Sequence, residues 1–117
     1  MSRDYKLYLY DILDCCQIVR QFTEGQTFEQ FSEDRKTADA VIRNLEIVGE
    51  AVKNIPSDVL HEHAQIEWKQ IARFRDHAGH RYFGVRLTIV WDIVQNKIEE
   101  LEAAVQQILE SDQEPEN

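Results

Sequence analysis

Residues 85–109 read VRLTIVWDIVQNKIEELEAAVQQIL, and this stretch decides the fold class. Its apolar side chains recur at steps of three and four residues, which is the spacing of one face of an α-helix. The pattern predicts one long helix from about Val85 to Leu109. The third predicted helix is too short to cover this stripe, so a second copy of the chain is the simplest candidate for covering the rest. The stripe consists of Leu87, Val90, Trp91, Val94, Ile98, Leu101, Val105 and Ile108.

Three earlier segments show the same helical period, and no window alternates for long enough to predict a strand. Gly25, Pro56 and Gly79 follow these segments in turn and are expected to interrupt the chain after them. Four amphipathic helices joined by short links predict an all-α antiparallel helical bundle. The three segments span about residues 4–22, 34–55 and 64–76.

Two connectors carry local signals of their own. Thr27 followed by Gln30 has the spacing of a capping box, here for a short turn that carries Phe28 and Phe31. The connector after Pro56 is expected to fold back as one short turn through Val59 and Leu60. Beyond Gly79, residues 80–84 read as a loop.

Length and composition limit the class of protein. A chain of 117 residues suffices for one domain, which we place at residues 1–110, followed by an acidic flexible tail at 111–117. No run of about 18 apolar residues predicts a membrane span, and the first residues lack a signal-peptide core, so a cytoplasmic protein is expected. Cys15 and Cys16 are adjacent on a predicted helix, about 100° apart, which disfavours a mutual disulfide and favours buried, reduced thiols.

Charge is distributed unevenly along the chain. Thirteen basic and 22 acidic residues give a formal charge of −9, which argues against a general nucleic-acid or anionic-membrane binder. Residues 69–86 nevertheless hold five basic residues against one acid. Such a basic island in an acidic protein indicates a localised site for an anion. Its charged members are Lys69, Arg73, Arg75, Asp76, Arg81 and Arg86.

The chemistry of this island suits phosphate. Arg75 offers a planar, permanently charged fork, and His80 can exchange a proton near neutral pH. Such groups can cleave RNA without a metal, if one imidazole takes the 2′-hydroxyl proton, another protonates the leaving oxygen and arginine stabilises the charge on phosphorus. One chain supplies one such set, so a symmetric dimer would complete the site. The plainer alternative is that Arg75 caps helix carbonyls and both His77 and His80 are surface residues.

A metal site is not expected. His61-Glu62-His63 and His77-Ala78-Gly79-His80 have spacings found among metal ligands, but no cysteine or third histidine completes a zinc pattern. No Gly-rich phosphate loop, nucleophile elbow or His-Glu-x-x-His motif occurs. We therefore assign neither metal nor cofactor.

The island also carries a family resemblance. Arg75, four residues, His80, one residue and Tyr82 match the Arg-x4-His-x-Tyr motif of HEPN-domain toxins of the HepT type. Residues 43–51, RNLEIVGEA, resemble the second-helix signature of that group, and residues 82–91 resemble its junction between the motif and the fourth helix. The resemblance extends over roughly residues 3–109. Two departures are His77-Ala78-Gly79, where apolar side chains are usual, and Arg86, where an acidic helix cap is common.

The resemblance implies a four-to-five-helix HEPN bundle that forms a homodimer, with two motifs facing one cleft. It implies a metal-independent endoribonuclease, the toxin of a toxin–antitoxin pair, whose partner is an MNT-type nucleotidyltransferase that attaches AMP to Tyr82. In this interpretation Arg75 holds the scissile phosphate, His80 transfers protons and Asp76 orients one of them. Contacts to the RNA backbone would come from Arg73, Arg81 and Arg86, with His77 as a lesser candidate. The alternative is a non-catalytic HEPN module that binds nucleotide or the partner enzyme.

Overall fold

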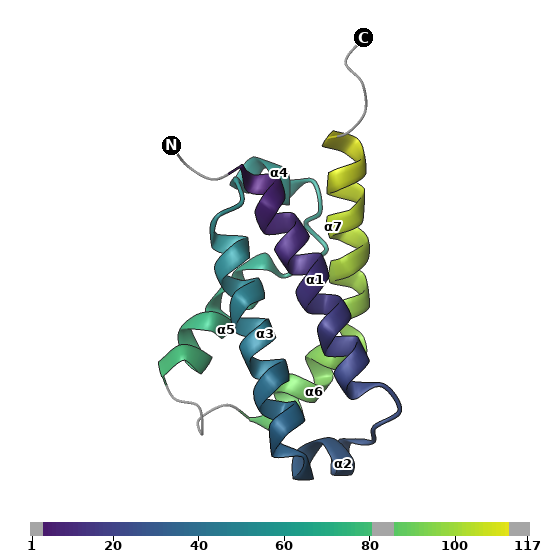
Figure 1. The fold of residues 1–117 in the computed structure, drawn as a ribbon. Coiled ribbons are helices and arrows are strands. Elements are labelled where there is room, and N and C mark those ends of the chain that lie inside the picture. The colour runs from purple at the N-terminus through teal and green to yellow at the C-terminus, as the bar shows by residue number, and fades with distance from the viewer. Residues whose placement is uncertain (1–3, 81–85, 113–117) are drawn as a thin grey trace.

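Four helical arms run antiparallel to one another in the computed structural model (Figure 1). The structure describes residues 4–80 and 86–112, with the backbone alone at residues 75–80 and 112, and every regular element within these ranges is a helix. The all-α antiparallel bundle predicted from the sequence is confirmed. The elements are α1 (Tyr5–Thr23), α2 (Phe28–Glu33), α3 (Arg35–Lys53), α4 (Ser57–His61), α5 (Trp68–His80), α6 (Leu87–Asn96) and α7 (Ile98–Asp112).

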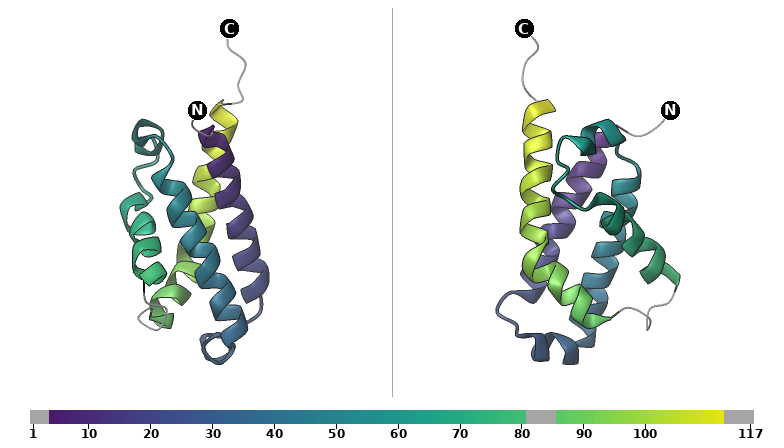
Figure 2. Two further views of the ribbon diagram at one scale, coloured as in Figure 1. Left: turned by 60° about the vertical axis from the view of Figure 1, so that its left-hand side comes forward. Right: turned by 180° about the vertical axis from the view of Figure 1, so that it is seen from behind.

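The order of the arms follows from their packing. Helix α3 packs against both α1 and α5, and α7 runs alongside α1 and packs against it (Figure 2). Short α2 closes one end of the bundle and α4 lies at the other (Figure 1). Within residues 4–80 and 86–112, no helix is both long and apolar enough to cross a membrane.

Polar caps set the starts of the first three helices. The Asp4 carboxylate accepts a hydrogen bond from the backbone N–H of Lys6 at 3.0 Å, which fixes the start of α1. At α2 the capping box predicted from Thr27 and Gln30 is confirmed, with reciprocal hydrogen bonds of 3.1 and 2.9 Å. Asp34 accepts from the backbone N–H of Thr37 at 3.1 Å and starts α3. These caps satisfy backbone donors that a helix start leaves without partners.

The apolar stripes of α1, α3 and α7 meet in one core. Residues from all three helices are at most 5% exposed, and those from α7 include Ile98, Leu101, Val105 and Ile108 of the stripe predicted from the sequence. A partly buried ion pair joins α1 to α7, where Arg20 Nη2 lies 3.2 Å from Oε1 of the buried Glu102. The centre of the core contains Leu9, Ile12, Val19, Val41, Val48 and Val105.

Cys15 and Cys16 are both free and buried, as the sequence predicted. Burial, reinforced by the nearby carboxylates of Asp14 and Glu102 respectively, raises the pKa of Cys15 to about 11 and that of Cys16 to about 12. A neutral thiol is a poor nucleophile and a poor metal ligand. These cysteines therefore act as small apolar core residues.

The prediction of one helix from Val85 to Leu109 is wrong, because α6 and α7 are separate helices that meet at an angle (Figure 1). The break is at Lys97, whose φ of −121° leaves the helical range. The hydrogen bonds from Lys97 N to Ile93 O and from Leu101 N to Lys97 O persist across it. The bend lets α6 contact α2 while α7 stays against α1.

An aromatic cluster holds α6 against the end of the bundle. The ring of Trp91 on α6 lies 5.0 Å from that of the fully buried Phe31 and 6.2 Å from that of Phe28, centroid to centroid. Both pairs are tilted, an arrangement that favours aromatic contact. Helix α2 therefore positions α6, and with it one wall of the region described next.

Candidate active site

Helix α5 carries the first part of the predicted site, and it runs further than the sequence suggested. Its backbone stays helical from Trp68 to His80, so the expected end at Asp76 and the expected break at Gly79 are wrong. A glycine in a helix costs only about 1 kcal/mol relative to alanine, whereas a proline stops the helix sterically. Arg75, Asp76 and His80 therefore share one helix, and His80 is not in a loop.

Helix geometry then fixes how these positions are spaced. Positions 75 and 80 are five residues apart, which separates them by about 7.5 Å along the axis and about 140° around it. Positions 76 and 80 are one turn apart and lie on the same side of the helix. The side chains at 75–80 lie outside the described residues, as do Arg81 and Tyr82 entirely. The structure thus brings Arg75, Asp76, His77 and His80 onto the last turns of α5 and leaves Tyr82 untested.

The start of α5 is also later than predicted, because a tertiary contact fixes it. Residues 62–66 form turns, with backbone hydrogen bonds from His63 to Leu60 and from Ile66 to His63. The buried Trp68 then donates its indole N–H to the carbonyls of Leu60 and His63, at 3.1 and 3.0 Å. This side chain ties α5 to the turn that follows α4.

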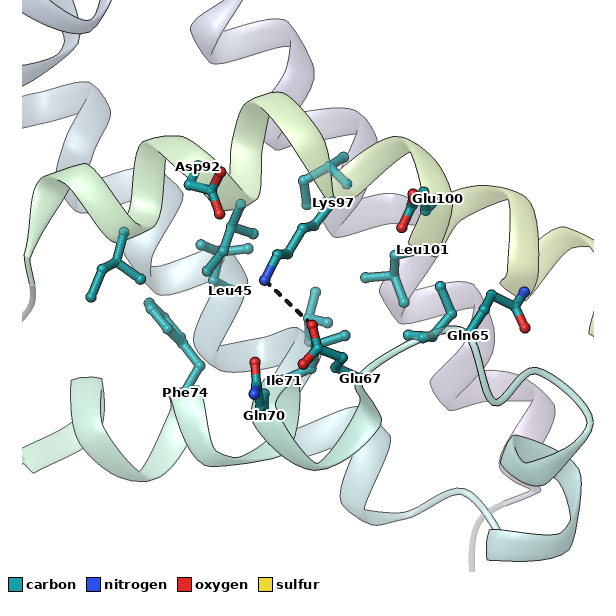
Figure 3. A pocket seen from close by; sticks show the side chains of 15 residues that line it. Leu45, Gln65, Glu67, Gln70, Ile71, Phe74, Asp92, Lys97, Glu100 and Leu101 are labelled. Atoms are coloured by element: carbon teal, nitrogen blue, oxygen red, sulfur yellow. Dashed lines mark ion pairs between the residues drawn. The ribbon is translucent and has the colours of Figure 1, made fainter.

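Beside α5 lies a groove of about 270 Å³, bounded by α3, α5, α6 and α7 (Figure 3). Its walls are mainly apolar, and Phe74 and Ile71 line it from the same helix that carries Arg75. Ile89 on α6 lines it too and is 52% exposed. The groove was not predicted from the sequence. A signal for it in the sequence was Ile89, an apolar residue that lies beside the predicted stripe and is not needed to fill the core.

The rim of the groove is polar and carries more acidic than basic residues. Lys97 reaches across from the junction of α6 and α7 to Glu67, with 3.7 Å between Nζ and Oε1 (Figure 3). Asp92 and Glu100 are the other charged lining residues. Since Lys97 offsets Glu67, the lining as a whole is acidic, which disfavours a phosphate backbone inside the groove itself.

The structure describes the side chains of three basic residues of the island, and all three are exposed. Lys69 and Arg73 are one turn apart on α5, and Arg86 is the residue that precedes α6. Arg86 makes no side-chain cap to α6. Arg73 therefore lies in the middle of α5 and Arg86 immediately before α6, and in sequence they flank the segment that contains Arg81 and Tyr82.

No group of three or more His, Cys, Asp or Glu side chains that could hold a metal ion occurs within the described part of the chain. His61 is exposed at the end of α4, and His63 is half-buried in the following turn. The pair His77 and His80 lies outside the described side chains.

Comparison with known proteins identifies the family. A family model described as ribonuclease HepT-like matches residues 12–108, which includes the whole of α5 and α6. The chain belongs to the HepT-like ribonuclease family. The Arg-x4-His-x-Tyr resemblance noted from Arg75, His80 and Tyr82 therefore indicated the right group.

Individual relatives agree with the family assignment. The chain is 47% identical over 97 residues to a Methanocaldococcus jannaschii protein named as a candidate RNase, covering 83% of this chain and 80% of the relative. It is 43% identical over 108 residues to the "Probable ribonuclease HepT" of Thermococcus cleftensis, covering 92% and 98%. A candidate RNase of Caldanaerobacter subterraneus is 41% identical over 105 residues, covering 90% and 94%. No solved structure gives a significant match.

Proposed function

We propose that this HepT-like chain is an endoribonuclease that cleaves RNA without a metal, using Arg75 and His80 at a site completed by a second copy of the chain. The match of the HepT-like family over residues 12–108 is the observation that carries the proposal, because this range contains both residues at the family's spacing. The RNase names of several relatives that are 41–47% identical also support it.

Each residue of the motif has a distinct part in the proposed reaction. Arg75 binds the scissile phosphate through its guanidinium fork and stabilises the added negative charge in the transition state. His80 moves a proton at the 2′-hydroxyl or at the leaving 5′-oxygen. Asp76 precedes His80 by one helical turn, a spacing that suits a carboxylate which orients the imidazole. A two-fold dimer would then supply the second imidazole that cleavage requires.

The basic residues around the motif would contact the RNA chain. Arg73 is exposed in the middle of α5 and Arg86 is exposed just before α6. Arg81 lies between them in sequence, and His77 on α5 is a further candidate. Phosphate contacts by such residues position RNA without reading its bases. Because the chain carries a net charge of −9, binding away from these residues is disfavoured.

Regulation is proposed to act on Tyr82, two residues beyond His80. A nucleotidyltransferase partner of the MNT type would attach AMP to its hydroxyl, as the resemblance implies. Each AMP brings bulk and at least one negative charge close to Arg75, where it competes with the RNA phosphate. The chain would then be the toxin of a toxin–antitoxin pair whose antitoxin is that enzyme.

The decisive experiment measures cleavage of a labelled RNA by purified chain in buffer containing EDTA. His80→Ala and Arg75→Ala should each lower the rate by about 10²-fold or more, and Arg75→Lys should recover little, because the planar fork is lost. The matched controls are His61→Ala and Arg35→Ala, which alter exposed residues on α4 and α3. Abolition of activity by EDTA, or full activity of His80→Ala, would refute the mechanism.

A second experiment addresses Tyr82. Co-expression with the proposed partner, a nucleotidyltransferase of the MNT type, should raise the mass of the chain by one or more AMP units on the peptide that contains Tyr82. Tyr82→Phe should abolish the increase. Modification of Tyr5, Tyr8 or Tyr10 instead would show that the regulatory hydroxyl is wrongly assigned.

A further inference from the structure

The groove beside α5 exposes apolar side chains to solvent. Its volume is about 270 Å³, and it is lined by Ile89, the most exposed large apolar side chain of the described residues at 52%. Ile71, Phe74 and Ile93 line it as well and are only half-buried. Exposed apolar surface of this kind, gathered in one hollow, marks a contact site for another molecule.

The charged groups around this apolar surface are mostly acidic. The described residues that line the groove include three carboxylates and one ammonium, those of Glu67, Asp92, Glu100 and Lys97. Lys97 is paired with Glu67, whereas Asp92 accepts a hydrogen bond of 2.7 Å from the neutral amide of Asn96. The carboxylates are therefore in excess, and the rim attracts cations.

The side chain of Lys97 shows which chemistry this surface accepts. It reaches from the junction of α6 and α7 across the groove, so that an aliphatic stem crosses between the walls and its ammonium ends at the Glu67 carboxylate (Figure 3). The two side chains are 44% and 58% exposed. An ion pair that is so exposed contributes little to stability, so a cation from outside can replace Lys97 beside Glu67 at small cost.

The length of the groove matches about two turns of a helix. On the side of α5 its lining runs from Glu67 to Phe74, which is roughly 10 Å at helical rise. Side chains at positions i, i+3 or i+4, and i+7 of a helix cover that same length on one face. A helix laid along the groove would thus bring three apolar side chains against Ile71, Phe74 and Ile89, with its flanks toward the carboxylates of the rim.

We propose that this groove binds an amphipathic helix of another protein, one that carries an apolar stripe flanked by lysine or arginine. The stripe enters the groove, and the basic side chains pair with Asp92 and Glu100. RNA fits less well, because the acidic rim repels phosphate, and a second copy of the chain fits less well, because each copy carries a net charge of −9. The inference goes beyond the proposed function, since it requires neither RNA cleavage nor the Arg75–His80 motif.

The first test measures the binding of two fluorescein-labelled peptides to the full chain by fluorescence anisotropy. Each peptide has about 14 residues, or roughly four helical turns, with leucines in the same helical stripe. The other positions are lysine in one peptide and glutamate in the other. The lysine peptide should bind about tenfold or more tightly than the glutamate peptide. Equal binding of both, or binding of neither, would overturn the proposal.

Matched charge variants test whether this preference arises in the groove. Asp92→Lys/Glu100→Lys should weaken binding of the lysine peptide about tenfold and strengthen that of the glutamate peptide. Glu99→Lys/Glu110→Lys makes the same change of net charge at exposed residues of α7 that do not line the groove, and it should preserve the preference for lysine. Equal effects of the two double variants would indicate general attraction to an acidic chain and overturn the proposal.

The apolar contact is tested separately with Ile89→Ser. This variant should weaken binding of the lysine peptide roughly fivefold, because a polar side chain replaces apolar contact in the groove. Leu7→Ser is the matched control, since Leu7 is 45% exposed on α1 and does not line the groove, and it should bind as the wild type does. Equal binding by Ile89→Ser and wild type would overturn the proposal. Loss of self-association in Ile89→Ser, measured by light scattering, would do so as well and assign the groove to a second copy.

Discussion

Replacement of Phe31 by alanine should be the most informative single change to the fold. Phe31 is fully buried on α2, and its ring centroid lies 5.0 Å from that of Trp91 on α6. This contact links the end of the bundle to the helix that carries Ile89. Phe31→Ala therefore removes both core packing and the restraint on the groove wall.

The size of the effect follows from burial. Truncation of a fully buried phenylalanine costs about 3–5 kcal/mol, which includes the lost aromatic pair. For a domain of this length, about 4 °C in melting temperature corresponds to each kcal/mol, so Tm should fall by about 12–20 °C. The matched control is Phe22→Ala, which truncates a phenylalanine that is 47% exposed and should cost less than about 1 kcal/mol.

The assay is urea and thermal unfolding followed by far-UV circular dichroism. Both variants must be compared at one protein concentration, because the proposed dimerisation would make apparent stability depend on concentration. If the urea midpoint falls while the dependence of the unfolding free energy on urea concentration (the m value) is unchanged, the variant has lost stability and its denatured state is not altered. A loss in Phe31→Ala no larger than that in Phe22→Ala would refute the view that α2 holds α6 in place.

Further predictions concern a turn, an ion pair and the thiols. Gly25→Ala should lower the free energy of unfolding by about 1–2 kcal/mol, measured by urea unfolding, because Gly25 has φ 78° although an added Cβ would meet nothing within 4 Å. Arg20→Ala should lower the free energy of unfolding by about 1–2 kcal/mol. This is less than the loss expected on breaking a fully buried ion pair, because Arg20 is half exposed while Glu102 is buried. The double variant with Glu102→Gln should recover part of that loss in the same assay. Native Cys15 and Cys16 should react with iodoacetamide far more slowly than the unfolded chain. Burial raises the pKa of both thiols above 9.0, so the unfolded chain ionises first and the urea midpoint should fall as pH rises through about 9–11.

The sequence predicted those helix starts that depend on local chemistry. Thr27 and Gln30 cap α2 through their own neighbours, so their spacing alone predicted the cap, and the start of α1 was expected at about residue 4, where Asp4 caps it. The start of α5 depends instead on the Trp68 indole, which bonds carbonyls five and eight residues earlier. The apolar residues before Trp68 fit a helical period equally well, and periodicity could not distinguish a turn from a helix there.

The break between α6 and α7 could not be predicted from the sequence, because periodicity does not reveal it either. The i to i−4 hydrogen bonds continue on both sides of Lys97, so the apolar stripe keeps its phase while the axis bends. The bend accompanies the contact of Trp91 with Phe31, which joins segments distant in the sequence. For the site, residue types and spacing indicated Arg75 and His80, but the groove needed four helices assembled in three dimensions.

The unbroken course of α5 through Gly79 also limits which changes of length the motif can accept. A loop between Arg75 and His80 could absorb an added residue by bulging, with its ends unmoved. A helix cannot, because each inserted residue turns everything beyond it by about 100° and advances it by about 1.5 Å. The helix therefore fixes the distance and the angle between Arg75 and His80. A glycine-to-alanine change at position 79 leaves both unchanged, whereas a single insertion or deletion nearby alters both. One inserted residue and one deleted residue would turn His80 by about 100° in opposite directions and so place it on different sides of the helix.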